Sequence, residues 1–440
     1  MVKQGVQQRP ALQQIAAAII GNALEWYDFI VFGFFTPVVA GIFFPSSSEY
    51  SSLLLTTASF GVGFLVRPLG GIFIGVVADR YGRRLALQLI ILLMTIATAM
   101  IAFAPTYASI GVGASLWIVI ARMLQGLATG GEFASATAFL IEVAPEGKRG
   151  AYGAWQMVGQ GLALLLGAAA GAALTHNLSH DQLYSWGWRL PFAFGLLIAP
   201  VGFWIRRHLQ EPEPREDRHS KDPTGTSLKQ HRRALISSFL MTAFATSSFY
   251  VLVIYMPTFV HTSLAIPLDS AFTGQCVGVI AMIITTALSG AISDRFGRRP
   301  VMQLAIFLLI LALYPLYSWL IALPSSDRFA LVQAILCGLF GAGIGPYSAA
   351  VAEQFSAKVR STGMAISYNM AVMLFGGFGQ FIVTWLLHAT GSLMTPALYV
   401  LTGALLGLCG TTLMRRSAEG GRARSAGPSQ DVGIRQIGTP

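Results

Sequence analysis

The sequence predicts an all-α membrane protein with twelve transmembrane helices, arranged as two pseudo-symmetric bundles of six. Three observations lead to this prediction. Only 11% of the 440 residues are charged while 54% are hydrophobic, whereas a soluble domain has about 25% charged residues. The apolar residues gather in long stretches, and two loop motifs recur at about half the chain length. This composition argues against a soluble enzyme, a disordered protein and a nucleic-acid-binding protein.

Each apolar stretch is long enough for a transmembrane helix, which needs about 20 residues. The stretches exceed the ~10-residue alternating segments of a membrane barrel, and a helix satisfies its own backbone groups in lipid. In the first half they are 13–44, 52–77, 85–105, 113–142, 151–176 and 187–207. In the second half they are 234–261, 270–293, 301–322, 328–353, 361–388 and 393–414.

Polar segments divide the chain into five parts. The first apolar stretch is too long for a signal-peptide core and contains acidic residues, so we expect a retained helix. The tail is rich in Gly, Ser and Arg, which is typical of disorder. The parts are 1–12 (N-terminus), 13–207 (first bundle), 208–233 (linker), 234–414 (second bundle) and 415–440 (disordered tail).

Basic residues predict the orientation in the membrane. In a twelve-span arrangement, 25 of the 29 Lys and Arg residues lie on one side. Such a bias marks the cytoplasmic side, so both termini and the linker are expected there. The net charge of +10 therefore reflects topology rather than a nucleic-acid partner. The four remaining basic residues are Arg67, Arg122, Arg189 and Arg328.

Two pairs of motifs indicate an internal repeat. The segment Gly75–Arg84 (GVVADRYGRR) returns as Gly290–Arg299 (GAISDRFGRR), 215 residues later. The segment Glu142–Arg149 returns as Glu353–Arg360 with the same internal spacing, 211 residues later. Parallel repeats of this kind are the arrangement of a two-bundle transporter.

Five ionisable residues lie inside predicted spans, where such groups are usually functional because insertion costs about 2.5–3.5 kcal/mol at the helix centre. If the fourth span is one continuous helix, its polar residues fall within an arc of about 80° and are expected to line a central cavity. The five are Glu25 and Asp28 (first span), Arg67 (second span), and Arg122 and Glu132 (fourth span). The polar stripe of the fourth span also includes Gln125 and Thr129.

These residue types suit proton-coupled transport of an anion. The fork of a guanidinium matches a carboxylate, so Arg67 and Arg122 are the expected substrate anchors. A carboxyl group tends to be neutral in a low-dielectric cavity and charged beside an arginine. Glu25, Asp28 or Glu132 could therefore bind and release the coupling proton, if the substrate changes which arginine the carboxylate faces. The alternative is that permanent ion pairs only hold the helices together.

Uncharged polar residues are further candidates for substrate contacts, although such groups also bond neighbouring helices. No P-loop, metal cluster or nucleophile–base pair is apparent, so we expect no enzyme activity and no cofactor besides the proton as coupling ion. The scattered cysteines, Cys276, Cys337 and Cys409, predict neither a disulfide nor a metal site. The uncharged candidates are Asn22, Tyr27, Gln125, Gln156, Gln160, Tyr250, Tyr347 and Asn369.

The Gly75–Arg84 motif resembles the signature loop of the major facilitator superfamily. Within that superfamily the chain resembles the metabolite:proton symporters, on the motifs Gly21–Phe29, Phe64–Gly70, Arg122–Glu132 and Trp186–Phe192. The resemblance implies a monomeric transporter in the inner membrane of a bacterium. It implies symport of protons with a small di- or tricarboxylate such as citrate by alternating access. Oxoglutarate, shikimate and proline or betaine are the alternative substrates.

The resemblance also implies a gating role for the repeated loops. Asp79 would cap the start of the eleventh span and Asp294 that of the fifth, because a helix N-terminus carries about +0.5 charge and free N–H groups. Arg80 and Arg83 would pair with acids such as Glu142. The expected gating residues are Gly75, Asp79, Arg80, Gly82, Arg83, Arg84, Glu142, Arg149, Asp294, Arg295, Gly297, Arg298, Glu353 and Arg360.

Overall fold

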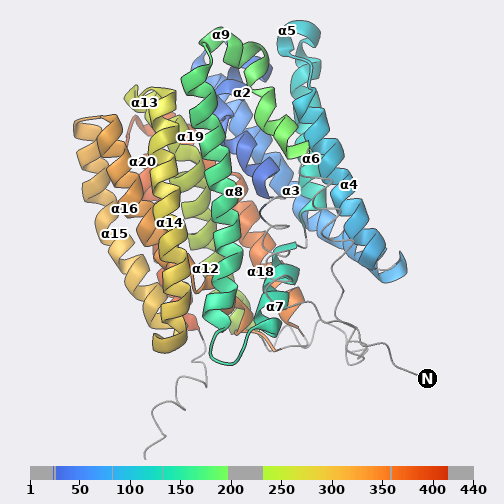
Figure 1. Cartoon of the computed structure of the whole chain (residues 1–440), viewed down its shortest axis with the longest axis vertical. Coiled ribbons are helices and arrows are strands. Elements are labelled where there is room, and N and C mark those ends of the chain that lie inside the picture. The colour runs from blue at the N-terminus through green and yellow to red at the C-terminus, as the bar shows by residue number, and fades with distance from the viewer. Residues whose placement is uncertain are drawn as a thin grey trace, which may run out of the picture.

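The computed structural model describes residues 23, 26–81, 83–130, 132–196, 231–356 and 359–414. Their regular structure is helical throughout, and most of the long helices run along the long axis of the molecule (Figure 1). We call the end that holds the repeated loops the inner end and the opposite end the outer end. In Figure 1, α5 and α9 lie at the outer end and α7 at the inner end.

The first half begins with a helix over Trp26–Phe34, which meets the next helix at an angle of 71°. A helical segment over 189–196 ends the described part of this half. The elements between them are α2 (Thr36–Phe43), α3 (Glu49–Tyr81), α4 (Arg83–Ala102), α5 (Tyr107–Ile110), α6 (Val112–Ala128), α7 (Glu132–Val143), α8 (Arg149–Asn177), α9 (His180–Gln182) and the π-helix η1 (Leu183–Gly187).

The second half contains six helical spans, two of which include a π-helical segment. The seventh span consists of α12 (Arg232–Ser247), η3 (Ser248–Tyr255) and α13 (Met256–Leu264). The eleventh consists of α18 (Arg360–Ala371), η4 (Val372–Gly377) and α19 (Gly379–Thr390). The remaining elements are α14 (Leu268–Phe296), α15 (Arg298–Ala322), α16 (Ser326–Ile344), α17 (Tyr347–Ala352) and α20 (Thr395–Leu413).

All twelve predicted spans have a helical counterpart in the described residues. Eight helices are long and apolar enough to cross a membrane, and the bent pair in the first span makes a ninth. Two shorter apolar helices, Gln88–Ala102 and Val112–Ala128, correspond to the third and fourth predicted spans. The sixth, 187–207, is described only to residue 196. The prediction of an all-α membrane fold is therefore confirmed.

The first span is bent, whereas the sequence predicted one continuous helix over 13–44. Pro37 has no backbone N–H, so it cannot donate to the carbonyl of Gly33 four residues earlier. The hydroxyl of Thr36 donates to that carbonyl instead, at 2.7 Å. The helix therefore ends at Phe34, and α2 starts in a new direction.

The fourth span is also interrupted, which corrects the prediction of one helix over 113–142. Helix α6 ends at Ala128 and α7 starts at Glu132. Glycine is about 1 kcal/mol less favourable than alanine inside a helix, and two glycines lie between these helices. A Cβ atom at Gly130 would overlap the backbone of α3 at Arg67 and Gly71. The break therefore lets α3 pass close to the fourth span.

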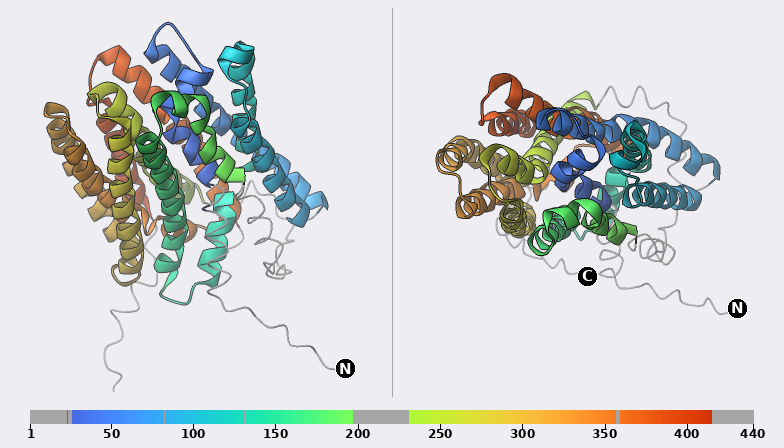
Figure 2. Two further views of the ribbon diagram at one scale, coloured as in Figure 1. Left: turned by 45° about the horizontal axis from the view of Figure 1, so that its top comes forward. Right: turned by 90° about the horizontal axis from the view of Figure 1, so that it is seen from above.

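The two halves meet along several helices, including α7 and α8 against α17 and α18. Helix α8 packs along α14, and α3 packs against η4 and α19. Small residues allow this approach: Gly161 in α8 faces Ile283, and Gly61 in α3 faces Phe378. Seen from above, the first half (blue to green) lies toward one side and most of the second half (yellow to red) toward the other (Figure 2).

Candidate functional site

Arg122 in α6 is fully buried in a box of aromatic rings. Its Cζ atom lies 4.1 Å from the ring centroid of Phe29, 4.5 Å from that of Phe32 and 4.7 Å from that of Phe60. One guanidinium nitrogen, Nη1, donates to Oε1 of Gln125 at 2.6 Å. Its Nε and Nη2 atoms have no hydrogen-bond partner among the residues that the structure describes.

Arg67 in α3 also lies close to the Phe29 ring and is 3% exposed. Its Cζ atom is 4.7 Å from the centroid of Phe29, 4.3 Å from that of Phe64 and 5.8 Å from that of Trp26. Its Nε atom also lacks a partner within the described part of the chain. Within that part, no carboxylate forms a salt bridge with either arginine.

Two buried cations without a described counter-ion are costly, because removing a charge from water costs several kcal/mol. Cation–π contacts return part of that cost, at roughly 0.5–2 kcal/mol each. The free N–H groups on the guanidinium edges can bind carboxylate oxygens in fork geometry. The arrangement is therefore chemically suited to an acidic ligand.

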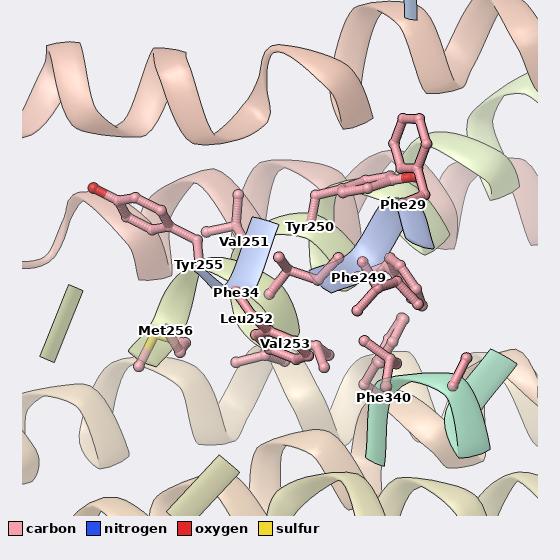
Figure 3. Packing of buried hydrophobic residues seen from close by; sticks show 14 of the residues in the cluster. Phe29, Phe34, Phe249, Tyr250, Val251, Leu252, Val253, Tyr255, Met256 and Phe340 are labelled. Atoms are coloured by element: carbon pink, nitrogen blue, oxygen red, sulfur yellow. The ribbon is translucent and has the colours of Figure 1, made fainter. Parts of the chain in front are cut away.

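The second half contributes a buried tyrosine to the same region. Tyr250 lies in η3, and its ring is 5.8 Å from that of Phe60 and 5.2 Å from that of Phe64. Its hydroxyl has no hydrogen-bond partner among described atoms. Phe60 and Phe64 also contact Phe29, so they lie next to both residues. Figure 3 shows that Tyr250 and Tyr255 point in opposite directions. Short π-helical segments often occur at functional sites, because they change which side chains face inward.

A small cavity of about 30 Å³ lies between the two halves. It is comparable with the volume of one water molecule, so a larger ligand fits only after the halves move apart. Gln160 faces this cavity, and its Nε2 atom has no described partner. The lining residues are Phe133, Met157, Gln160, Ala245, Phe249, Phe340, Ile344, Tyr347 and Tyr368.

Contacts between the halves lie on both sides of this cavity. Toward the inner end, the rings of Phe133 and Tyr368 stack with centroids 4.1 Å apart. Asn369 donates to the carbonyl of Gly130 at 2.8 Å, which satisfies a group left free by the break in the fourth span. Toward the outer end, the rings of Tyr50 and His388 stack at 3.8 Å. Asn369, a predicted substrate contact, thus bonds across the halves here.

Three other predicted substrate contacts are already hydrogen-bonded. Gln156 accepts a hydrogen bond from Thr137 at 2.6 Å. The hydroxyl groups of Tyr347 and Thr242 are 2.7 Å apart, although Tyr347 also lines the cavity. Tyr27 donates to the carbonyl of Pro191 at 3.2 Å and so points toward the sixth span. A role of these residues in substrate binding stays a prediction.

The structure places Asp28 away from the arginine pair. Its Oδ2 atom accepts a hydrogen bond from Thr98 in α4 at 2.8 Å, and the residue is 7% exposed. Its Oδ1 atom has no partner among the described residues and lies against Gly195, where a Cβ atom would overlap it. The expectation that this carboxylate faces an arginine is therefore not met here.

The other acidic candidates remain predictions. Asn22 and Glu25 lie outside the described residues, as does the side chain of Glu132. The predicted stripe of the fourth span assumed one continuous helix, but α6 ends at Ala128 and α7 starts at Glu132. The place of Glu132 in that stripe therefore stays a prediction.

One of the two loop aspartates caps a helix of the opposite half, as the sequence resemblance implies. Both carboxylate oxygens of Asp294 accept backbone N–H groups at the start of α8, from Gly150 at 2.8 Å and Ala151 at 2.9 Å. Arg298 forms salt bridges with Asp294 at 2.6 Å and with Glu353 at 3.2 Å. Gly297 between them has a φ of 92°, which favours glycine.

The equivalent loop of the first half is only partly described. Gly82 and the side chains of Asp79, Arg83 and Arg84 lie outside the described part, while Arg80 is exposed. Gly75 lies within α3, and Arg295 lies over the ring of Phe296. The described salt bridge of Glu142 is with Arg360 across the halves, at 3.8 Å. The expected pairing of Arg80 and Arg83 with Glu142 stays a prediction. Arg149 begins α8.

The sequence did not single out two features of this region. Nothing in the sequence distinguished Phe29, Phe60 and Phe64 from other apolar residues, because aromatic residues are common in apolar spans. Gln380 in α19 is fully buried, and neither polar atom of its amide has a described partner. It lies near Gly33 of the first span. Its presence in an apolar stretch could have marked it, by the reasoning used for Gln156 and Gln160.

Comparisons with known proteins agree with this architecture. A family model described as Major Facilitator Superfamily matches residues 18–288, and one described as Sugar (and other) transporter matches residues 207–414. The chain is 36% identical to a citrate-proton symporter of Salmonella typhi, covering 90% of this chain and 92% of that protein. It is 30% identical to a proline/betaine transporter of Salmonella typhimurium, covering 92% and 83%. A solved structure of the xylose transporter from E. coli, partially occluded and inward open, matches with a TM-score of 0.74 at 17% identity, covering 90% of this chain and 96% of that one.

Proposed function

Because the chain belongs to the major facilitator superfamily, we propose that it is a secondary active transporter that imports a small organic acid together with protons. The substrate is a di- or tricarboxylate of the citrate type. The main support is the arginine pair: Arg67 and Arg122 are buried, and three of their N–H-bearing nitrogens have no described partner. Two guanidiniums suit a ligand with more than one carboxylate.

Asp28 is the proposed proton site among the described residues. It is a buried carboxyl group with one free oxygen and a single hydroxyl donor. Burial without a cation favours its neutral form. Opening of the helices around it would expose it to water, where it would release the proton. Glu25 and Glu132 remain the alternative proton sites.

Transport proceeds by alternating access, with the two halves rocking about the central cavity. The Asp294 cap on α8 and the Glu142–Arg360 salt bridge join the halves at the inner end. These contacts break when the carrier opens inward. By the distribution of basic residues, both termini face the cytoplasm of a bacterial cell, and the carrier works as a monomer.

A zwitterion such as betaine is the second candidate substrate. One relative carries proline and betaine by its name, and aromatic rings bind quaternary ammonium groups well. Here, however, the rings of Phe29, Phe32, Phe60 and Phe64 already stack on guanidiniums. Because these rings already contact the arginines, the site favours an organic acid over a zwitterion.

Uptake into proteoliposomes with an imposed pH gradient tests the proposal. The substrate panel is citrate, tricarballylate, succinate, oxoglutarate, shikimate and betaine. We expect accumulation of at least one di- or tricarboxylate that collapses when a protonophore is added. Accumulation of betaine without any acid would contradict the carboxylate assignment. Uptake that does not respond to the pH gradient would contradict proton coupling.

A further inference from the structure

We propose that the ring of Phe29 acts as a neutral bridge that holds Arg67 and Arg122 in position, in place of a counter-ion, so that both can receive the carboxylates of the substrate. This inference deepens the proposed function and rests on it. It makes Phe29 a positioning residue for substrate binding, although its side chain has no polar atom.

Phe29 is the one described ring that contacts both guanidiniums. Its centroid lies 4.7 Å from Cζ of Arg67 and 4.1 Å from Cζ of Arg122. Its neighbours fix its orientation, because it meets the ring of Phe60 edge-on at 5.4 Å and that of Phe64 at 4.9 Å. The residue is 1% exposed, so water does not weaken these contacts.

The rings and a carboxylate use different parts of a guanidinium. Aromatic rings stack on its flat faces, while its N–H groups point outward in the plane and form hydrogen bonds. On Arg122, Gln125 uses Nη1 and leaves Nε and Nη2 free. A substrate carboxylate can therefore bind these two nitrogens while Phe29 keeps its contact with the guanidinium.

A carboxylate in the place of Phe29 would be less suitable for holding the two guanidiniums in position. It would occupy the same N–H groups that the substrate needs, so the substrate would first have to displace it. An aromatic face attracts the cation through its quadrupole without using any N–H group. The two guanidiniums are therefore arranged to bind an anion without first losing another carboxylate.

Stepwise fluorination of Phe29 tests the bridge, because fluorine removes negative charge from the ring face and changes its shape little. We would replace Phe29 by 4-fluoro-, 3,5-difluoro- and 3,4,5-trifluorophenylalanine and measure proton-driven uptake of the best-transported acid in proteoliposomes. We expect KM to rise with each fluorine, by about tenfold for the trifluoro ring, while the maximal rate changes little.

Phe34 provides the matched control. It lies on the same helix, is fully buried, and packs against Phe272 at 6.1 Å without a described cation contact. The same fluorinated series at Phe34 should leave KM unchanged. A KM that does not respond to fluorination of Phe29, or that responds equally at both positions, would overturn the bridge.

Failure of the Phe29 bridge can be distinguished from failure of the proposed function. If the unmodified carrier accumulates no acid under a pH gradient, the proposed function is refuted and the bridge with it. If the unmodified carrier accumulates an acid and only the graded response at Phe29 is missing, the bridge alone is refuted.

Discussion

Substitution of Arg122 by methionine removes a buried guanidinium whose Nε and Nη2 atoms lack partners among the described residues. If these atoms bind a substrate carboxylate, the variant loses two charge-assisted hydrogen bonds, each contributing about 1.5–3 kcal/mol. Together they amount to about 3–6 kcal/mol, or roughly a 100- to 20,000-fold rise in KM. The measurement is initial uptake of the organic acid over a wide concentration range.

Thermal unfolding of the same variant separates this role from that of a structural ion pair. Removing one partner of a buried pair costs about 3–5 kcal/mol, because the other charge is left unpaired. Removing an unpaired buried charge should leave stability unchanged or raise it. We therefore expect Arg122→Met to unfold at or above the temperature of the unmodified carrier in detergent.

The matched control is Arg189→Met. Arg189 lies nearer the outer end and donates to the backbone carbonyls of Ser185 and Ala104. Its replacement should leave KM unchanged. An Arg122→Met carrier that keeps its affinity for the acid, or that unfolds at a much lower temperature, would refute the substrate-anchor reasoning and favour the structural ion pair.

Three further predictions concern the proton site and the inner contacts. Asp28→Asn should abolish accumulation driven by a pH gradient while exchange of labelled for unlabelled acid continues; loss of both activities would contradict a role limited to the proton. Asp294→Ala removes a helix cap of about 0.5–2 kcal/mol and should lower the uptake rate several-fold, with unchanged amounts of protein in the membrane by immunoblot. Glu142→Arg and Arg360→Glu should each reduce uptake only two- to fivefold, because exposed pairs contribute about 0.2–1 kcal/mol and Glu142 is about half exposed. The double variant should recover part of that loss, and additive losses would contradict the pairing.

The sequence predicted the twelve spans well because span length and hydropathy are set by the membrane itself. The repeated loop motif indicated Asp294 because the two halves have the same arrangement of helices and loops. In the structure this residue contacts the start of α8. The positions of Pro37 and Gly130 carried the information for both helix breaks. The hydropathy of the two stretches does not show these breaks, because both stretches are apolar throughout.

The direction in which each side chain points could not be predicted in the same way. A hydropathy pattern that is apolar on all sides does not define which face of the first span meets the cavity. The sequence therefore offered Asp28 as one of three possible proton sites near the arginines, without predicting its contact with Thr98. The aromatic box around Arg122 is formed by three segments that are distant in sequence, so no local sequence motif predicts it.

The direction in which the Asp28 side chain points bears on how proton binding can be coupled to substrate binding. Asp28 and Phe29 are consecutive residues of one helix, yet Asp28 contacts α4 and Phe29 contacts both arginines. If Asp28 binds the proton and the arginine pair binds the substrate, as proposed, the two occupy separate places and do not compete for one charged group. A proton on Asp28 would change how the helix packs against α4 and the sixth span, and any resulting shift or rotation of that helix would move the Phe29 ring. The first span would thus transmit the state of the proton site to the substrate site mechanically, over a single peptide bond.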